Sequence, residues 1–223
     1  MKSIALVSGF DSRVLFEILR QEESGIEAAY FKLGMPNQEQ EMASLPAGTH
    51  VFDAPWDHPY QGGVPDLTGR DLLMCARVVI ALAPDRIYLG QLPEEVGNFR
   101  DNNHVATSLY SAVLSQIAGK PVTVSYPLVE RGLTKFALAK EGARLGLDLP
   151  SLNSCFAGGC GQCYKCAIRR AIDITLGAQC SYEELEALLR MGGAIERGLL
   201  EHFGKPNTAE LLQEKFREKH DRN

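Results

Sequence analysis

Short β-prone runs alternate with segments of helical periodicity along most of the chain, and this alternation constrains the fold more than any other feature. The β-prone runs span residues 4–7, 27–31, 50–52, 86–89 and 122–124. Apolar residues recur at helical spacing at Val14, Leu15, Ile18 and Leu19 and over residues 72–83, 105–117 and 134–145. Such alternation predicts a parallel sheet with helices on both faces. We therefore expect a doubly wound α/β domain over residues 1–150.

The remaining residues, 151–223, are expected to form a small zinc-binding helical region, with helices over 182–191 and 209–220. The Pro- and Gly-containing stretch 54–69 is expected to be mostly a loop that faces substrate. In open parallel sheets, ligands bind beyond the carboxyl ends of the strands. This rule directs attention to residues 8–12 and 90–101.

Charge and hydropathy exclude several classes of function. The formal net charge is -5, and the Lys and Arg residues are scattered, which argues against direct nucleic-acid binding. The apolar stretch in MKSIALVSGF is too short for a signal peptide, and the apolar region 74–83 is interrupted by Arg77 and too short to span a membrane. We therefore expect a cytoplasmic protein with no membrane contact.

Four of the six cysteines, Cys155, Cys160, Cys163 and Cys166, lie close together in the sequence. In a reducing compartment, such clustering favours a metal over disulfides. Four soft thiolates suit one tetrahedral zinc ion, and the intervening glycines let the chain wrap tightly around it. Because protein would fill all four positions, the zinc would be structural. An iron–sulfur cluster or a redox pair is the alternative interpretation.

The turn Ser8-Gly9-Phe10-Asp11-Ser12 falls between the first expected strand and the first expected helix. Backbone N–H groups at a helix N-terminus favour phosphate, so a nucleotide phosphate would fit there. The alternative is that Asp11 or Ser12 only caps the helix.

Together, the turn, the cysteine cluster and residues between them resemble the 7-cyano-7-deazaguanine synthase (QueC) family of PP-loop ATP pyrophosphatases over most of the chain. The family opens with a strand followed by Ser-Gly-Gly-x-Asp-Ser, to which residues 8–12 are similar with one residue missing. A Pro-Gly-Arg-Asn stretch heading a helix resembles residues 68–71, and a strand ending in Gly is matched at Gly90, where we expect a close backbone approach.

Further along the chain, an Asp-Cys-Arg segment of the family is similar to residues 101–103, in which only Asp101 is kept. A Leu-x-Lys helix start resembles residues 133–135. The most specific match is Ser-Cys, a short insert, Cys-Gly-x-Cys-x-x-Cys and a following Arg, which resembles residues 154–166 with Arg169. The Tyr-Gly-Gln segment of the family's second strand is only loosely similar to residues 33–35.

The resemblance implies a sheet like that of the HUP, or adenine nucleotide alpha hydrolase-like, proteins and an ATP-dependent carbon–nitrogen ligase of queuosine biosynthesis. Such an enzyme adenylates the carboxylate of 7-carboxy-7-deazaguanine, lets ammonia form the amide, and activates that amide to eliminate water to the nitrile. The resemblance also implies a homodimer. The first alternative is a close variant that acts on another carboxylate.

The resemblance assigns roles to residues by their match to the family's motifs. The ATP phosphates would be bound by Ser8, Gly9, Asp11 and Ser12. Asp11 would bind them through Mg²⁺. Three further residues would face the nucleotide, the substrate or the leaving group: Arg70, Asp101 and Lys135. We expect Asp101 and Lys135 to meet the 8–12 turn across one pocket, since all lie near the carboxyl ends of strands.

Each assignment has a structural alternative. Arg70 and Lys135 would then be solvated charges at helix ends, Asp101 would cap the following helix, and Arg169 would form a surface ion pair. At the level of function, the alternatives are a non-catalytic, zinc-stabilised nucleotide or deazapurine binding protein and a sulfur-transfer enzyme. Sulfur transfer would need a reactive thiolate at Cys75 or Cys180.

Overall fold

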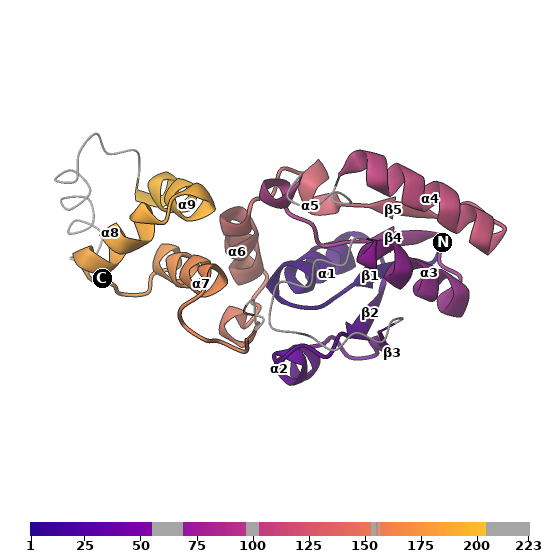
Figure 1. Cartoon of the computed structure of the whole chain (residues 1–223), viewed down its shortest axis with the longest axis horizontal. Coiled ribbons are helices and arrows are strands. Elements are labelled where there is room, and N and C mark those ends of the chain that lie inside the picture. Colours follow the sequence, from indigo (N-terminus) through magenta and orange to yellow (C-terminus); the bar gives the residue numbers. More distant parts are fainter. Residues whose placement is uncertain (55–68, 97–102, 153–154, 156, 204–223) are drawn as a thin grey trace. The chain divides into compact units, whose positions relative to one another are not determined.

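The computed structural model describes residues 1–54, 69–96, 103–152, 155 and 157–203. The chain divides into two compact units, Met1–Gly158 and Gly159–Asn223 (Figure 1). The first unit contains the sheet, and the described part of the second is helical. The expected domain boundary after residue 150 stays a prediction.

The sheet of the first unit has five parallel strands, which confirms the predicted fold class. The strands are β1 (Ser3–Leu6), β2 (Glu27–Lys32), β3 (His50–Asp53), β4 (Arg86–Tyr88) and β5 (Thr123–Ser125). Their order is β3-β2-β1-β4-β5, and every neighbouring pair is parallel. Ile4 of β1 lies in register with Glu27 of β2 on one side and with Ile87 of β4 on the other. The central strand β1 therefore adjoins both halves of the sheet.

Helices fill most connections between the strands. The first unit contains α1 (Phe10–Glu22), α2 (Gln38–Ala43), α3 (Arg70–Leu82), α4 (His104–Ala118), α5 (Pro127–Glu130), α6 (Lys135–Arg144) and the 3₁₀ turns η1 (Pro93–Glu95) and η2 (Leu149–Ser151). The second unit contains α7 (Tyr164–Thr175), α8 (Tyr182–Arg190) and α9 (Gly193–Phe203). The helix expected over 209–220 and residues 55–68 of the expected loop lie outside the described residues. Among the described residues, no helix combines the length and apolar character needed to cross a bilayer.

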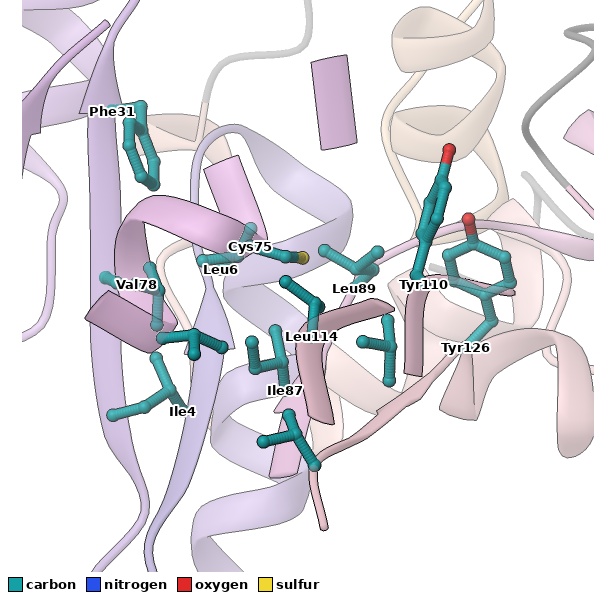
Figure 2. Packing of buried hydrophobic residues seen from close by; sticks show 14 of the residues in the cluster. Ile4, Leu6, Phe31, Cys75, Val78, Ile87, Leu89, Tyr110, Leu114 and Tyr126 are labelled. Atoms are coloured by element: carbon teal, nitrogen blue, oxygen red, sulfur yellow. The ribbon is translucent and has the colours of Figure 1, made fainter. Parts of the chain in front are cut away.

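The main apolar core lies between one face of the sheet and the helices α3 and α4. Figure 2 shows strand and helix side chains meeting in this core, among them Ile4, Leu6, Cys75, Val78, Ile87, Leu89 and Leu114. Because successive strand side chains point to opposite faces, Ala5 points to the other face, which α1 covers. Close packing on both faces fixes the carboxyl ends of β1 and β4, where the candidate site begins.

Candidate functional site

The candidate site lies where the strand order reverses. Chain connections lead from β1 through α1 to β2 on one side of the sheet, and from β4 through α4 to β5 on the other. Neighbouring strands whose connections diverge leave a crevice beyond their carboxyl ends, and ligands of open α/β sheets bind there. Residues 7–12 and 89–94 leave β1 and β4 at this point.

The turn after β1 is held by the Ser12 side chain. The residue that precedes α1 is Gly9, which has no side chain to cap the helix. Instead, the Ser8 N–H donates to Ser12 Oγ over 2.7 Å, and the Ser8 and Ser12 hydroxyl oxygens lie 3.3 Å apart. The turn is therefore closed on itself at the N-terminus of a 13-residue helix, where the first N–H groups lack partners within the helix.

Gly90, just beyond β4, lies directly against this turn. A Cβ atom at Gly90 would lie 2.8 Å from both Cα and Cβ of Ser12 and 3.0 Å from its backbone nitrogen. Real Cβ atoms essentially never approach other atoms so closely, so the site requires glycine here. The expected close backbone approach at Gly90 is confirmed.

Lys135, the first residue of α6, brings a positive charge to the same turn. Its Nζ lies 2.5 Å from Oδ1 of Asp11 and 4.6 Å from the centroid of the Phe10 ring. Its backbone N–H donates to Oε1 of Glu94 over 2.7 Å. Since Lys135 is only 7% exposed, it is not the solvated helix-end charge of the alternative interpretation. Three segments far apart in the sequence, α1, η1 and α6, therefore meet at one lysine.

Of the other two expected catalytic residues, the structure describes only Arg70. Arg70 begins α3, and its Nε donates to Oδ1 of the neighbouring Asp71 over 3.1 Å. Among the described residues, Arg70 makes no hydrogen bond or ion pair with Asp11 or Lys135. Asp101 lies outside the described residues. The N-cap of α4 is Asn103, whose side chain accepts from the Ala106 N–H over 2.9 Å. The structural alternative for Asp101 stays a prediction.

The segment 155–166 forms a candidate metal centre. The sulfur atoms of Cys155, Cys160, Cys163 and Cys166 all lie within 4.8 Å of one another. The Sγ atoms of Cys160 and Cys166 are 3.9 Å apart, and those of Cys163 and Cys166 are 3.7 Å apart. A tetrahedral ion with zinc–sulfur bonds of about 2.3 Å requires sulfur–sulfur edges of about 3.8 Å. The cluster therefore has the donor chemistry and spacing to hold one zinc ion, with no position left for a substrate.

Local backbone structure explains how this segment turns so tightly. Gly158, Gly159 and Gly161 all have positive φ angles, a conformation that side chains with a Cβ rarely adopt. The Gly161 N–H donates to Sγ of Cys166 over 3.3 Å, and α7 begins directly after Cys163. Arg169 of α7 forms an ion pair with Asp173, and its Nε lies 2.9 Å from Oδ1 of that residue. The structural alternative for Arg169 predicts such an ion pair.

The two cysteines outside the cluster do not favour sulfur transfer. Burial raises the pKa of the Cys75 thiol well above its ordinary value, and the nearby Asp71 carboxylate adds to this effect. Burial likewise raises the pKa of the Cys180 thiol. Because the thiolate is the reacting species, a raised pKa disfavours nucleophilic chemistry at both positions.

Sequence reasoning did not assign a role to Phe10 or Glu94, which both contact Lys135. One available signal was a large aromatic residue inside a glycine-containing turn, where a small residue would be ordinary. Another was the acidic pair after Pro93, directly following a strand that ends near the expected site.

Comparisons with known proteins agree with this geometry over the middle of the chain. Residues 70–172 match the family model described as "Queuosine biosynthesis protein QueC". A curated relative, the 7-cyano-7-deazaguanine synthase of Novosphingobium aromaticivorans, is 38% identical over 84 residues, which cover 35% of this chain and 33% of the relative. The chain therefore spans about a third of that relative's length. The family match includes Gly90, Lys135 and the four clustered cysteines, whereas the 8–12 turn precedes it.

Proposed function

The chain is a divergent QueC-like family member, and from this premise we propose that it is an ATP-dependent carbon–nitrogen ligase acting on a deazapurine carboxylate. The proposed reaction converts 7-carboxy-7-deazaguanine and ammonia to 7-cyano-7-deazaguanine through an adenylated intermediate. The observation that carries this proposal is the buried Lys135 ammonium beside the β1–α1 turn, at the carboxyl edge of the sheet. A cytoplasmic location is part of the same proposal.

The proposed chemistry needs a group that accepts developing negative charge. A carboxylate oxygen is a poor leaving group until it carries AMP, and pyrophosphate gains charge as it departs. Preorganised donors in a site shielded from water stabilise such charge most effectively. The N-terminus of α1 and the Lys135 ammonium supply donors of this kind, and Ser8, Gly9 and Ser12 would surround the phosphates.

Asp11 has two roles in this proposal. In the structure its carboxylate pairs with the Lys135 ammonium. Carboxylate oxygen is also a preferred ligand of Mg²⁺, which usually binds through one or two carboxylates together with substrate phosphates. Asp11 would therefore hold Mg²⁺ beside the phosphates, while Arg70 and Asp101 would face the nucleotide or the deazapurine.

Zinc has a structural role in this proposal. Cys155, Cys160, Cys163 and Cys166 would complete its coordination, and the bound ion would hold the glycine-containing segment in one conformation. Because a structural zinc contributes folding free energy directly, its removal would destabilise the fold rather than change a chemical step.

The direct test is release of AMP and pyrophosphate from ATP, measured with and without 7-carboxy-7-deazaguanine. Release that depends on this compound and on ammonia, with formation of the nitrile, would support the proposal. ATP binding without turnover on any deazapurine carboxylate would favour the non-catalytic alternative. A protein that binds neither ATP nor the deazapurine would refute both.

We extend the proposal to a homodimer, for which α4 carries a suitable surface. Four aliphatic side chains at successive fourth positions of α4 are between 46% and 69% exposed: Val105, Leu109, Val113 and Ile117. Exposed Leu73 and Ile80 belong to α3, which packs beside α4. The sequence of α4 contains no Asp, Glu, Lys or Arg. We call these six side chains the α3/α4 apolar face.

A second copy of the chain fits this face for geometric and electrostatic reasons. Ridges of residues spaced by four interlock with an identical ridge at a crossing angle of about −50°. In a two-fold dimer the same patch meets itself, and a helix without charged side chains meets its copy without repulsion. Two helices about 20 Å long and 8–10 Å apart present a face on the order of 400 Å² in projection, about half of the roughly 800 Å² per partner that a standard interface buries.

Sedimentation of the full chain tests this interface. Leu109→Glu should convert the dimer to a monomer, because the charge would be buried against its copy. Met42→Glu, at an exposed apolar residue of α2, is the matched control. A wild type that sediments as a monomer would contradict the dimer.

A further inference from the structure

Phe10 contacts the same ammonium as Asp11, from the adjacent position of α1. The Phe10 side chain is 1% exposed, and Lys135 Nζ lies 4.6 Å from its ring centroid. A cation within about 6 Å of a ring centroid is attracted by the ring quadrupole. Two successive residues therefore hold one positive charge, one through a carboxylate and one through an aromatic ring.

The two contacts differ in what they do to the charge. The Asp11 carboxylate neutralises the Lys135 ammonium, so the intact pair attracts an incoming phosphate weakly. An aromatic ring attracts the ammonium but carries no net charge, and so leaves its positive field in place. Lys135 also lies largely out of water, where a cation–ring contact is stronger than at an exposed site.

We propose that Phe10 is a positioning residue. It keeps the Lys135 ammonium beside the β1–α1 turn when the Asp11 carboxylate binds a metal ion or is displaced by a polyphosphate. The inference rests on the proposed function, since it takes the triphosphate of a nucleotide as the ligand at this turn. Without the ring, the released ammonium would be free to move toward water, because it sits on a flexible four-carbon side chain.

Packing alone would also bury a phenylalanine here, so the test must separate ring electrostatics from ring volume. Adding fluorine atoms to the ring weakens its quadrupole step by step while its shape changes little. A role in packing therefore predicts a flat response to fluorination, whereas a hold on the ammonium predicts a graded one. Leu, which keeps the apolar character but has no ring, provides a second variant.

The chain offers a matched control on the same helix. The guanidinium carbon of Arg13 lies 5.8 Å from the centroid of the Phe16 ring, and Phe16 is buried. Fluorination at Phe16 therefore perturbs another cation–ring contact of α1 that does not involve Lys135. Any general effect of fluorine on this helix should occur at both positions.

The experiment uses the full chain with zinc bound and with mono-, di- or trifluorophenylalanine at position 10 or 16. Affinity for a non-hydrolysable ATP analogue with Mg²⁺ is measured by calorimetry, and the unfolding midpoint is measured alongside. We expect a graded loss of affinity at position 10 of about tenfold in total, equivalent to about 1.4 kcal/mol. Position 16 should be unaffected, and the Phe10→Leu variant should lose at least as much affinity as the trifluorinated protein.

The outcomes separate this inference from the proposed function. If the wild type binds the analogue and the position 10 series is flat, Phe10 is a packing residue and the inference is wrong, while the proposed function stands. If the wild type does not bind the analogue, the proposed function fails and the inference fails with it. Equal losses at positions 10 and 16 would also overturn the role of Phe10.

Discussion

The ammonium nitrogen of Lys135 lies 2.5 Å from Oδ1 of Asp11, so the first residue of α6 is joined to the first turn of α1. Buried ion pairs are weak contributors to stability, because desolvation of both charges opposes their attraction. The pair also lies at the strand-order reversal, where open α/β sheets bind ligands. We therefore infer that the pair positions the Lys135 ammonium to bind an anionic ligand.

Replacement of Lys135 by Met should lower turnover on the true substrate more than it weakens substrate binding. Charge on the leaving pyrophosphate grows chiefly in the transition state, and loss of one preorganised donor typically costs about 10²–10³ in kcat. Steady-state kinetics provides the measurement, with Lys140→Met, at an exposed lysine of the same helix, as the control. An equal effect of both changes would remove the specific role of Lys135.

Asp11→Asn and Ser12→Ala should weaken ATP binding while the fold persists. Asp11 faces the ammonium, and the Ser12 hydroxyl accepts from the Ser8 N–H at the turn. Loss of the Ser12 hydrogen bond alone should reduce the free energy of unfolding by about 1 kcal/mol. If calorimetry shows unchanged nucleotide affinity and urea unfolding shows only this loss, the turn has a structural function.

Cys163→Ser should lose zinc and destabilise the fold, because the ion depends on four thiolates. Elemental analysis should give one zinc per wild-type chain and a strongly reduced content in the variant. Cys180→Ser lies outside the cluster and should retain the metal. A folded wild type that contains no metal after purification and does not take up added zinc would contradict the assignment.

The sequence predicted the strands and some of the helices, and missed α2, α5, α7 and α9, of which α7 and α9 span 12 and 11 residues. The strands and the helices α1, α3, α4 and α6 lie close to their expected positions. The short helix α2 has no buried residue, and α5 spans only four residues, so neither carries a periodic apolar pattern.

Part of the candidate site could be predicted for a similar reason. The carboxyl-edge rule correctly brought Lys135 to the 8–12 turn, since this rule depends only on strand direction. The contacts of Phe10 and Glu94 with Lys135 depend on how α6 packs against α1 and η1, which no local pattern encodes. The predicted meeting with Asp101 lies outside the described residues and stays a prediction.

Gly90→Ala should destabilise the first unit and weaken nucleotide binding together. The added methyl group would lie 2.8 Å from the Cα of Ser12, a backbone atom that cannot rotate away. Forced overpacking of this kind costs about 1–3 kcal/mol, and the shift would move the turn that is proposed to hold phosphate. Urea unfolding and calorimetry should report both losses, whereas unchanged values would mean that β4 and the turn can separate at little cost.

The ion pair between Arg170 and Glu184 should make the second unit sensitive to acid. The Arg170 guanidinium donates to both carboxylate oxygens, at 2.6 and 2.9 Å, and holds the pKa of Glu184 below its ordinary value of 4.5. Because the folded pKa is the lower one, the stabilisation is fully present above about pH 4.5 and is lost as the pH falls through the folded value.

Arg170→Met should therefore lower the unfolding midpoint at neutral pH, and its difference from the wild type should shrink below about pH 4.5. A residual difference should remain, because Arg170 also donates to the Gln179 carbonyl oxygen over 2.7 Å, a bond that does not titrate. The control is Arg190→Met, whose pair with Glu186 is more exposed and should matter less at every pH. A difference between Arg170→Met and wild type that stays constant from pH 7 to pH 3 would show that the carbonyl bond, rather than the ion pair, accounts for the contribution of Arg170.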